Sequence, residues 1–464
     1  MKTTRQGRGR LSRSIGLGAL GTVVMALAAG AWLSAQQPSA SQGQVTFAKD
    51  VAPILQRSCQ NCHRTGSVAP MSLLTYEETR PWARAIKQRV SAREMPPWGI
   101  DRNVGIQEFK NDMSLSDAEI AKVVKWVDAG APLGNAADMP PPRRFDDPRL
   151  WHIGNGKPDL IVSMPKAYRV PAVGADVTLE FLAETGLTED RWIKEVETKP
   201  DPKSFSVVHH ASLDIVEPWA GLDASRENYG MGGARSFLSE YALGKNGDIF
   251  PEGTGRLIRA GSKVNFNMHY YSTGEDVENV TSVGIVFYPK GQEPTHPVIT
   301  QHMGDTSDLD IPAGTVSRVD GYIQLSKNAQ LVMLQPHMHS RGKRQCTEAI
   351  IPQTTGDVSR GNGSRTQRVT LNCINYDMNW NMSYAYKDDV APLLPKGTII
   401  HITSWYDNTQ SKFNPDPRNW VGSGARSVDV MSFQWQSFFY LTDEEYQQKV
   451  KDRAAKAARS TDNQ

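Results

Sequence analysis

The sequence predicts a multidomain protein in which a small α-helical domain precedes two all-β sandwich domains. The chain has 464 residues, which is too long for one hydrophobic core and suggests about three domains. Residues 45–139 carry helix signals. After Pro158 the apolar segments become short and rich in Val, Ile, Tyr and Phe, with Gly, Pro, Asn and Asp between them, which is typical of strands and turns.

Composition and charge favour a soluble globular protein that has no nucleic-acid-binding face. Hydrophobic residues make up 39% of the chain and charged residues 22%, which is ordinary for this class. The formal net charge is +2, but residues 1–35 contain five basic residues and no acidic one, so the remainder carries a net negative charge. A negatively charged remainder excludes a basic surface of the kind that binds nucleic acids.

The N-terminus has the layout of a secretory signal. A basic stretch precedes an apolar run from Ile15 to Leu33, and the small residues Ser34 and Ala35 follow. We predict export to the periplasm or the extracellular space, with residues 1–35 as a signal peptide and residues 36–44 as a linker. The apolar run is nearly long enough to span a bilayer, so a retained membrane anchor is the alternative.

Residues 45–139 are expected to form the helical domain. Apolar residues at Phe47, Val51 and Leu55 follow a helical spacing. A second helix is predicted to begin after Ser116, because Glu119 three residues later completes a capping box. Its apolar face comprises Ile120, Val123, Val124 and Val127, and it ends at Gly130.

Between these helices lies the stretch Cys59-Gln60-Asn61-Cys62-His63, which reads CxxCH. At this spacing each thiol can bond one haem vinyl group while the histidine ligates iron, so we predict one covalent haem c. A zinc site is the alternative, but the chain has no second CxxC pair to complete it. With its flanking helices, the segment resembles a small class I cytochrome c domain.

The sixth iron ligand is expected to be Met95. Met71, Met95 and Met113 all follow the haem motif, but only Met95 lies in a proline-rich loop, Met95-Pro96-Pro97-Trp98. This loop resembles the one that presents the axial methionine in cytochrome c domains, and prolines there would hold the thioether in place. Met71 is interpreted as a core residue.

Residues 140–157 form a proline-rich linker, and the remaining chain is expected to be β-sheet. The strand-like segments predict two sandwich domains of jelly-roll type, at 158–295 and 296–445. A charged tail at 446–464 is expected to be helical or frayed and is given no function. Cys346 and Cys373 lie in the same predicted sandwich, where an exported protein can form a disulfide; two separate buried thiols are the alternative.

Four of the ten histidines stand in two close pairs along the predicted β-domains, and His269 follows a strand-like segment between these pairs. His337 and His339 are two residues apart, so on a strand both side chains point to the same face and can bind one metal ion. His209 and His210 are adjacent, and they can share a metal ion only if the strand bends or if different ring nitrogens are used. His152, His296, His302 and His401 stand alone and are interpreted as surface or core residues.

The order of these residues resembles that of the type II copper, ascorbate-dependent monooxygenases, which include peptidylglycine α-hydroxylating and dopamine β-monooxygenases. The resemblance rests on His209-His210, His269-Tyr270, His337-Met338-His339 and the methionine of Asp429-Val430-Met431, and it covers most of residues 158–445. The stretches 251–255, 260–262 and 406–408 are similar to bacterial members that carry a cytochrome c domain in front. In the family the last stretch usually has two acidic residues before the methionine, so Val430 is a departure.

The resemblance implies two copper ions and a hydroxylation reaction. His209, His210 and His269 would hold an electron-storing copper, and His337, His339 and Met431 an oxygen-activating copper. Three imidazoles suit both copper oxidation states, whereas a soft thioether favours Cu(I) and leaves a position open for O2. The implied partners are O2, a small organic substrate and an external electron donor, with the haem domain passing electrons to the three-histidine copper.

Two departures from the family concern the substrate. Peptide-hydroxylating members have an arginine two residues before HxH, and this position is Gln335 here. Phe433 and Trp435 replace an asparagine and a tyrosine. A peptide carboxylate would lack its bidentate partner, so we expect a smaller or more apolar substrate. The alternatives to a monooxygenase are an exported electron-transfer or copper-binding protein without oxygenase activity, and a binding module with core histidines.

Overall fold

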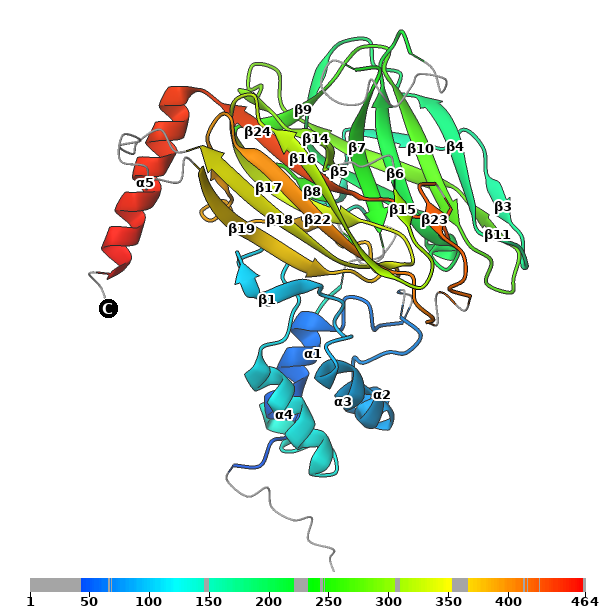
Figure 1. Cartoon of the computed structure of the whole chain (residues 1–464). Coiled ribbons are helices and arrows are strands. Elements are labelled where there is room, and N and C mark those ends of the chain that lie inside the picture. Colours follow the sequence, from blue (N-terminus) through cyan, green and yellow to red (C-terminus); the bar gives the residue numbers. More distant parts are fainter. Residues whose placement is uncertain are drawn as a thin grey trace, which may run out of the picture. The chain divides into compact units, whose positions relative to one another are not determined.

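The computed structural model consists mainly of antiparallel β-sheets, with helices near both ends of the described chain (Figure 1). It describes residues 43–461 except 66, 68, 146–149, 221–232, 243, 244, 246, 305–308, 353–365, 412, 413, 415 and 425. The expected signal or anchor and most of the expected linker after it therefore lie outside the described residues. Among the helices that the structure describes, none combines the length and the apolar character that a membrane span requires.

Short helices occupy much of residues 44–139. A π-helical turn (Phe47–Val51) leads into α1 (Ala52–Ser58), and α2 (Tyr76–Thr79), α3 (Ala83–Ser91) and α4 (Asp117–Asp128) follow. The predicted capping box is present, since Glu119 N donates to Ser116 Oγ (3.2 Å) and Ser116 N donates to Glu119 Oε2 (2.9 Å). Phe47 and Trp126 are buried, with ring centroids 5.8 Å apart, and they join the first and last of these helices.

One strand in this segment was not predicted. β1 (Ile100–Gly105) pairs with the edge of a β-sheet formed much later in the chain, along β19 (Thr366–Asn375). Gly105 has a positive φ of 68°, and a Cβ there would lie 1.9 Å from the carbonyl oxygen of Leu371, so only glycine permits this approach. Residues 45–139 are therefore not purely helical, because one of their segments pairs as a strand with the otherwise exposed edge of a β-sheet.

Two facing sheets form the N-terminal sandwich. One sheet has the order β4-β10-β6-β7 and the other β13-β9-β5-β12-β2. The bounds are β2 Leu160–Ser163, β4 Val177–Glu184, β5 Arg191–Pro200, β6 Val208–Val216, β7 Arg235–Ala242, β9 Thr254–Ile258, β10 Lys263–Tyr270, β12 Thr281–Phe287 and β13 His296–Pro297. Apolar residues that alternate along the strands, such as Ala211, Leu213 and Ile215 of β6, fill the space between the sheets.

Two further sheets form the C-terminal sandwich. Their orders are β1-β19-β18-β22-β16 and β14-β24-β17-β20. The bounds are β14 Ile299–Met303, β16 Val316–Gln324, β17 Asn328–His337, β18 Gly342–Pro352, β20 Tyr384–Ala385, β22 Ile399–Asp407 and β24 Phe433–Leu441. Cys346 of β18 and Cys373 of β19 lie directly opposite each other and form a disulfide, as predicted. The expected helical tail is α5 (Asp443–Thr461).

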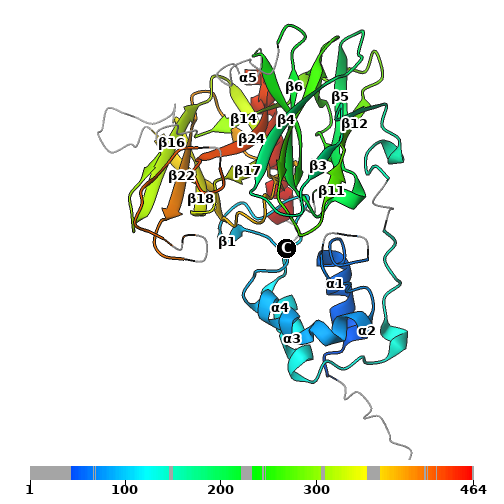
Figure 2. The same ribbon diagram turned by 90° about the vertical axis from the view of Figure 1, so that its right-hand side faces the viewer.

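The two sandwiches contact each other through β7 of one N-terminal sheet and through β9 and β13 of the other. The ring centroids of Phe237 (β7) and Trp435 (β24) are 4.9 Å apart, and Arg256 Nη2 donates to Thr300 Oγ1 of β14 at 2.8 Å. Figures 1 and 2 show the sandwiches as green strands and as yellow to red strands. β13 still pairs with β9, so the N-terminal sandwich extends just past the boundary predicted at residue 295. The sheet β4-β10-β6-β7 thus faces the sheet β14-β24-β17-β20.

Candidate metal centre

A β-bulge brings His209 and His210 to the same side of their strand. His269 of β10 lies opposite His210 of β6, but the next residue, Tyr270, lies opposite Val208. His209 is therefore the extra residue in the ladder, and such a bulge bends the strand and redirects its side chain. This is the local bend that two adjacent histidines require in order to share one ion. His269 is placed beside them by the sheet register.

The three imidazoles converge on one point. One ring nitrogen of each of His209, His210 and His269 lies within 4.8 Å of the others. The Nδ1 atoms of His209 and His210 are 3.0 Å apart. If both nitrogens bound one ion at about 2.0 Å, the angle between the two bonds would be about 97°, which is acceptable for a metal ligand pair. The group could hold a metal ion.

Burial keeps these histidines in the form that binds metal. Burial, together with the smaller effect of the nearby His269, lowers the pKa of His209 to about 4. The pKa of His210 lies well below its usual value, and that of His269 is also lowered, in both cases mainly by burial. Neutral imidazoles have a free lone pair at physiological pH, so the cluster is ready to ligate a cation without first losing protons.

The second expected ligand set comes from the C-terminal sandwich. His337 is the last residue of β17, and His339 follows in the turn that leads to β18, where Gly342 N donates to His339 O at 2.8 Å. The ring centroids of His337 and His339 are 5.5 Å apart. Nδ1 of His339 is buried and has no hydrogen-bond partner among the described residues, which leaves it available to a ligand. Met431 packs beside Phe433 in a small apolar cluster.

Hydrogen bonds to the backbone fix the segments that carry these residues. Tyr376 OH donates to the carbonyl oxygen of Met338, between the two histidines, at 2.5 Å. Tyr406 OH donates to the carbonyl oxygen of Met431. Arg341 Nε donates to Asn408 Oδ1 at 2.8 Å, and the same guanidinium group donates to the carbonyl oxygen of Val428. The turn after His339 and the loop before Met431 are thereby held together.

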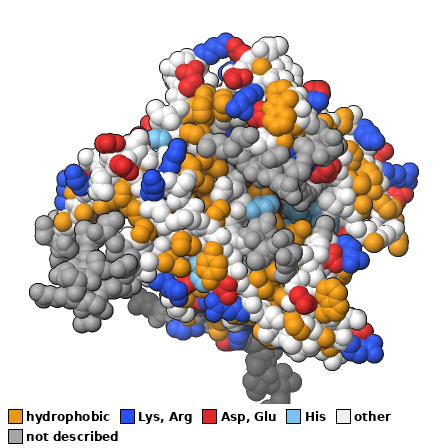
Figure 3. All heavy atoms as spheres, turned by 45° about the horizontal axis from the view of Figure 1, so that its top comes forward, with side chains coloured by type: hydrophobic (Ala, Val, Ile, Leu, Met, Phe, Trp, Pro, Cys, Tyr) orange, Lys and Arg blue, Asp and Glu red, His pale blue; other side chains and the backbone are white. Residues whose placement is uncertain are grey.

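All six expected ligands line one cavity of about 140 Å3 between the two sandwiches. His209, His210 and His269 lie on one wall, and His337, His339 and Met431 on the other. Histidine side chains reach the surface near the centre of the face in Figure 3, in a recess between hydrophobic side chains. The two ligand sets, which are separated in the sequence by up to about half of the chain, therefore line the same cavity.

The cavity also contains residues that the sequence did not single out. His302 of β14 stacks on Phe433, with centroids 3.9 Å apart, and Phe433 stacks on His337 at 4.5 Å. Asn381 Nδ2 lies 3.4 Å from His210 Nδ1, and Glu240 of β7 lines the wall. His302 had been interpreted as an isolated histidine, and only the sheet order β14-β24-β17 brings it to the cavity.

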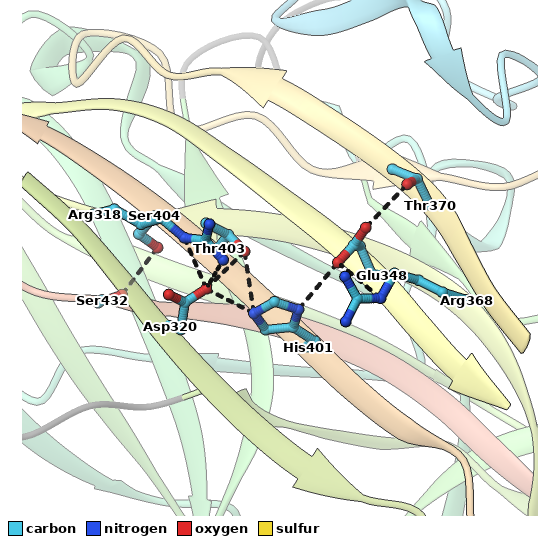
Figure 4. Close-up of polar contacts among 9 residues, drawn as sticks. All are labelled: Arg318, Asp320, Glu348, Arg368, Thr370, His401, Thr403, Ser404 and Ser432. Atoms are coloured by element: carbon cyan, nitrogen blue, oxygen red, sulfur yellow. Dashed lines mark hydrogen bonds and ion pairs between the residues drawn. The ribbon is translucent and has the colours of Figure 1, made fainter. Parts of the chain in front are cut away.

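His401 lies in a different polar network. Its Nε2 is 2.7 Å from Asp320 Oδ1 and its Nδ1 is 3.1 Å from Glu348 Oε2, and Thr403 also bonds Asp320 (Figure 4). The ring of Tyr322 stacks on His401 at 4.4 Å. Each ring nitrogen thus faces a different carboxylate, so these residues cross-link neighbouring strands rather than converge on one ion. The other isolated histidines, His152 and His296, pair with Glu197 and Glu445.

The CxxCH motif follows α1, and its cysteines are free thiols. Burial raises the pKa of Cys59 to about 12, and it also raises that of Cys62. His63 Nδ1 lies 3.3 Å from the carbonyl oxygen of Met71. This contact occupies one ring nitrogen and leaves Nε2 for a ligand, the arrangement expected of a metal-binding histidine.

Met95 is not brought to the CxxCH motif in any contact that the described residues show. It lines a cavity of about 690 Å3 between the helical segment and the C-terminal sandwich, together with Trp98, Pro336 and Tyr376. The described walls of this cavity do not include Cys59, Cys62 or His63. Met95 as the sixth iron ligand therefore stays a prediction.

Comparisons with known proteins do not place the chain in a family. No protein-family model and no curated protein matches it. Among solved structures, it is similar to that of broad bean stain virus, with 12% identity over 64% of this chain and 92% of that chain and a TM-score of 0.26. Peptide:N-glycanase F gives 12% identity over 61% and 96% of the two chains, with a TM-score of 0.21. A Bacteroides ovatus protein described as an α-L-fucosidase gives 10% identity over 69% and 43%, with a TM-score of 0.17. Scores this low carry no argument about fold or function.

Proposed function

We propose that this protein is an exported haem- and copper-dependent monooxygenase that hydroxylates a C–H bond of a small organic substrate with O2. The observation that carries the proposal is the single cavity lined by His209, His210, His269, His337, His339 and Met431. It supports the resemblance to the type II copper monooxygenases, in which these six positions are the ligands of two copper ions.

The donor set fits copper at both sites. Three neutral imidazoles on one wall, of which His269 is buried and the other two are half-buried, suit an ion that changes oxidation state with little rearrangement. Two imidazoles with a thioether suit Cu(I). When bound, copper would supply one-electron transfer and activation of O2. The protein's own contribution is to hold the ligands, to exclude bulk water and to position the substrate between the two walls.

The helical segment would be the electron donor. Cys59 and Cys62 would bond the haem covalently, His63 would ligate iron through Nε2, and Met95 is the proposed sixth ligand. The free thiols of the two cysteines and the backbone contact of His63 Nδ1 support this assignment. The reaction consumes two electrons for each substrate, so an attached electron carrier would replace or supplement an external reductant.

The substrate would be small and would not be a peptide carboxylate. Gln335 is buried, and its Oε1 accepts a hydrogen bond from Ser383 Oγ at 2.6 Å. A neutral amide here offers no bidentate cation for a carboxylate. Phe433 and Trp435 form an aromatic wall of the cavity, whose volume of about 140 Å3 suits a small group at the reacting position.

Export is proposed on the N-terminal signal and on the Cys346–Cys373 disulfide, which is compatible with an oxidising compartment. Cleavage of the signal would release the protein, and retention would anchor it.

The test is O2 consumption by protein that has been loaded with copper and haem, screened with small phenolic, amine and apolar compounds. We expect substrate-dependent O2 uptake with one hydroxylated product per O2, and its loss in His337→Ala. His296→Ala is the matched control, because it removes a histidine outside the cavity. Binding of both metals without substrate-dependent O2 uptake would instead indicate an electron-transfer or copper-binding protein. Absence of stoichiometric copper would contradict both functions.

A further inference from the structure

Glu240 is a carboxyl group on the wall of the metal cavity that the proposed ligand sets do not use. It lies on β7 directly opposite Ser212 of β6, and His210 lies two pairs further along, opposite Ala242. Side chains at such diagonal positions are about 7–8 Å apart at the backbone, so the carboxyl group lies near the three-histidine set without belonging to it. Met431 and His337 face it from the other wall of the same cavity.

One oxygen atom of this carboxyl group is buried without a hydrogen-bond partner among the described residues. Glu240 is only 5% exposed, and its Oε2 has no hydrogen-bond partner within the described part of the chain. Nε2 of Gln335, on strand β17 of the facing sheet, is also buried and has no hydrogen-bond partner among the described residues. Burial of an unpaired ionised carboxylate is strongly unfavourable, so the group is expected to hold a proton.

The surrounding charges leave the pKa of Glu240 near neutrality. Burial raises this pKa to about 7, Lys245 and the amide of Gln335 act to lower it, and Asp248 acts to raise it. Lys245 and Asp248 form an ion pair at 2.9 Å, so their opposite effects partly cancel. The group can therefore both release and regain a proton at physiological pH.

The other titratable groups that face the cavity are less suited to this task. His209, His210, His269 and His339 all have a lowered pKa, which disfavours the protonated imidazolium form that would act as the acid, and they are the proposed metal ligands. Tyr376 has a strongly raised pKa, and its hydroxyl group already donates to Met338 O. His302 is stacked between Phe433 and Trp435. Asp214 also lines the cavity, but it lies four residues along β6 from His210 and is therefore farther from the three-histidine set than Glu240.

We propose that Glu240 is the proton donor of the metal cavity. The inference rests on the proposed function, in which R–H, O2, two electrons and two protons give R–OH and H2O. One C–H bond and the O–O bond break, and the oxygen atom that does not enter the product leaves as water. Glu240 gives one proton to that oxygen atom and the second proton comes from solvent. The two electrons come from an external reductant, directly or one at a time through the haem, and the carboxylate is reprotonated from solvent.

The test is an infrared pH titration of the full-length metal-free protein. The carbonyl stretch of a protonated carboxyl group should disappear with a midpoint at about pH 7 in the wild type and be absent from Glu240→Gln. Glu197→Gln is the matched control. Glu197 is equally buried, but hydrogen bonds from His152 and the charge of Lys199 outweigh burial and lower its pKa, so this variant should keep the band.

A wild-type spectrum without a carboxyl band that titrates near neutrality would overturn the proposal, whether or not the variants fold. In copper-loaded protein, Glu240→Gln should lower kcat about 100-fold with little change in KM or copper content. An unchanged kcat would refute the role as donor even if the band is present. Failure of the proposed function would appear differently, as a lack of turnover in the wild type with the infrared result unaffected.

Discussion

Acid should destabilise the metal-free protein through the buried histidine cluster, and replacing His209 should remove much of this effect. The pKa of His209 is lowered from 6.5 to about 4, mainly by burial. Below pH 6.5 the unfolded chain takes up a proton at this residue while the folded protein does not. Stability is therefore constant above the unfolded pKa and falls as the pH drops from about 6.5 to about 4.

The expected loss of stability can be calculated from the pKa shift of His209. Each pKa unit corresponds to about 1.4 kcal/mol, so between pH 6.5 and pH 5 the contribution of His209 to the free energy of unfolding falls by about 2 kcal/mol. His210 carries a larger shift, and part of it comes from the charge of His209. Removing His209 therefore also relieves His210, and the effect of the substitution should be at least this large.

The assay is urea unfolding of the chelator-treated protein at pH 7 and at pH 5, for the wild type and His209→Gln. The difference in the free energy of unfolding between the two proteins should shift by about 2 kcal/mol in favour of the variant at pH 5. His296→Gln leaves the cluster intact and should retain the wild-type loss. Equal pH dependence in wild type and His209→Gln would refute the reasoning that the three imidazoles are buried together.

Three further outcomes are expected. Replacing Cys346 and Cys373 together by serine should lower the free energy of unfolding by about 3.5 kcal/mol, since the disulfide spans 27 residues; a change below about 1 kcal/mol in urea unfolding would contradict this. Met431→Ala should reduce bound copper from two ions to one per chain by elemental analysis, whereas a purely packing role would leave both. Replacing Cys59 and Cys62 together by serine should abolish haem that survives denaturing electrophoresis, and persistence of that haem would exclude the CxxCH attachment.

Local sequence patterns predicted most of the β-strands, because the tendency of a segment to form a strand depends mainly on residues close together in the sequence. The strands β4, β10, β17 and β22 coincide with segments rich in β-branched and aromatic residues. The helix that begins after Ser116 was predicted from its capping box, which uses only contacts within one turn. β1 was missed because it forms only by pairing with β19, more than 250 residues later.

The candidate site was predictable where spacing within one segment decides the geometry. The five expected histidine ligands and Met431 were identified from local spacing and family resemblance, and they line one cavity. The sequence showed only that the strand must bend if His209 and His210 are to share one ion. Whether the bulge forms depends on the register between β6 and β10, which the sequence does not show. His302 and Glu240 carried no local signal, since sheet order and the packing of one sandwich on the other bring them to the cavity.

The most direct test of the central claim is the copper content of the reconstituted protein, measured with one ligand removed from each wall of the cavity. We predict two copper ions per chain in the wild type, one in each of His210→Ala and His337→Ala, and none in the double variant. Two ions retained in either single variant, or no stoichiometric copper in the wild type, would contradict the account of two copper sites in this cavity.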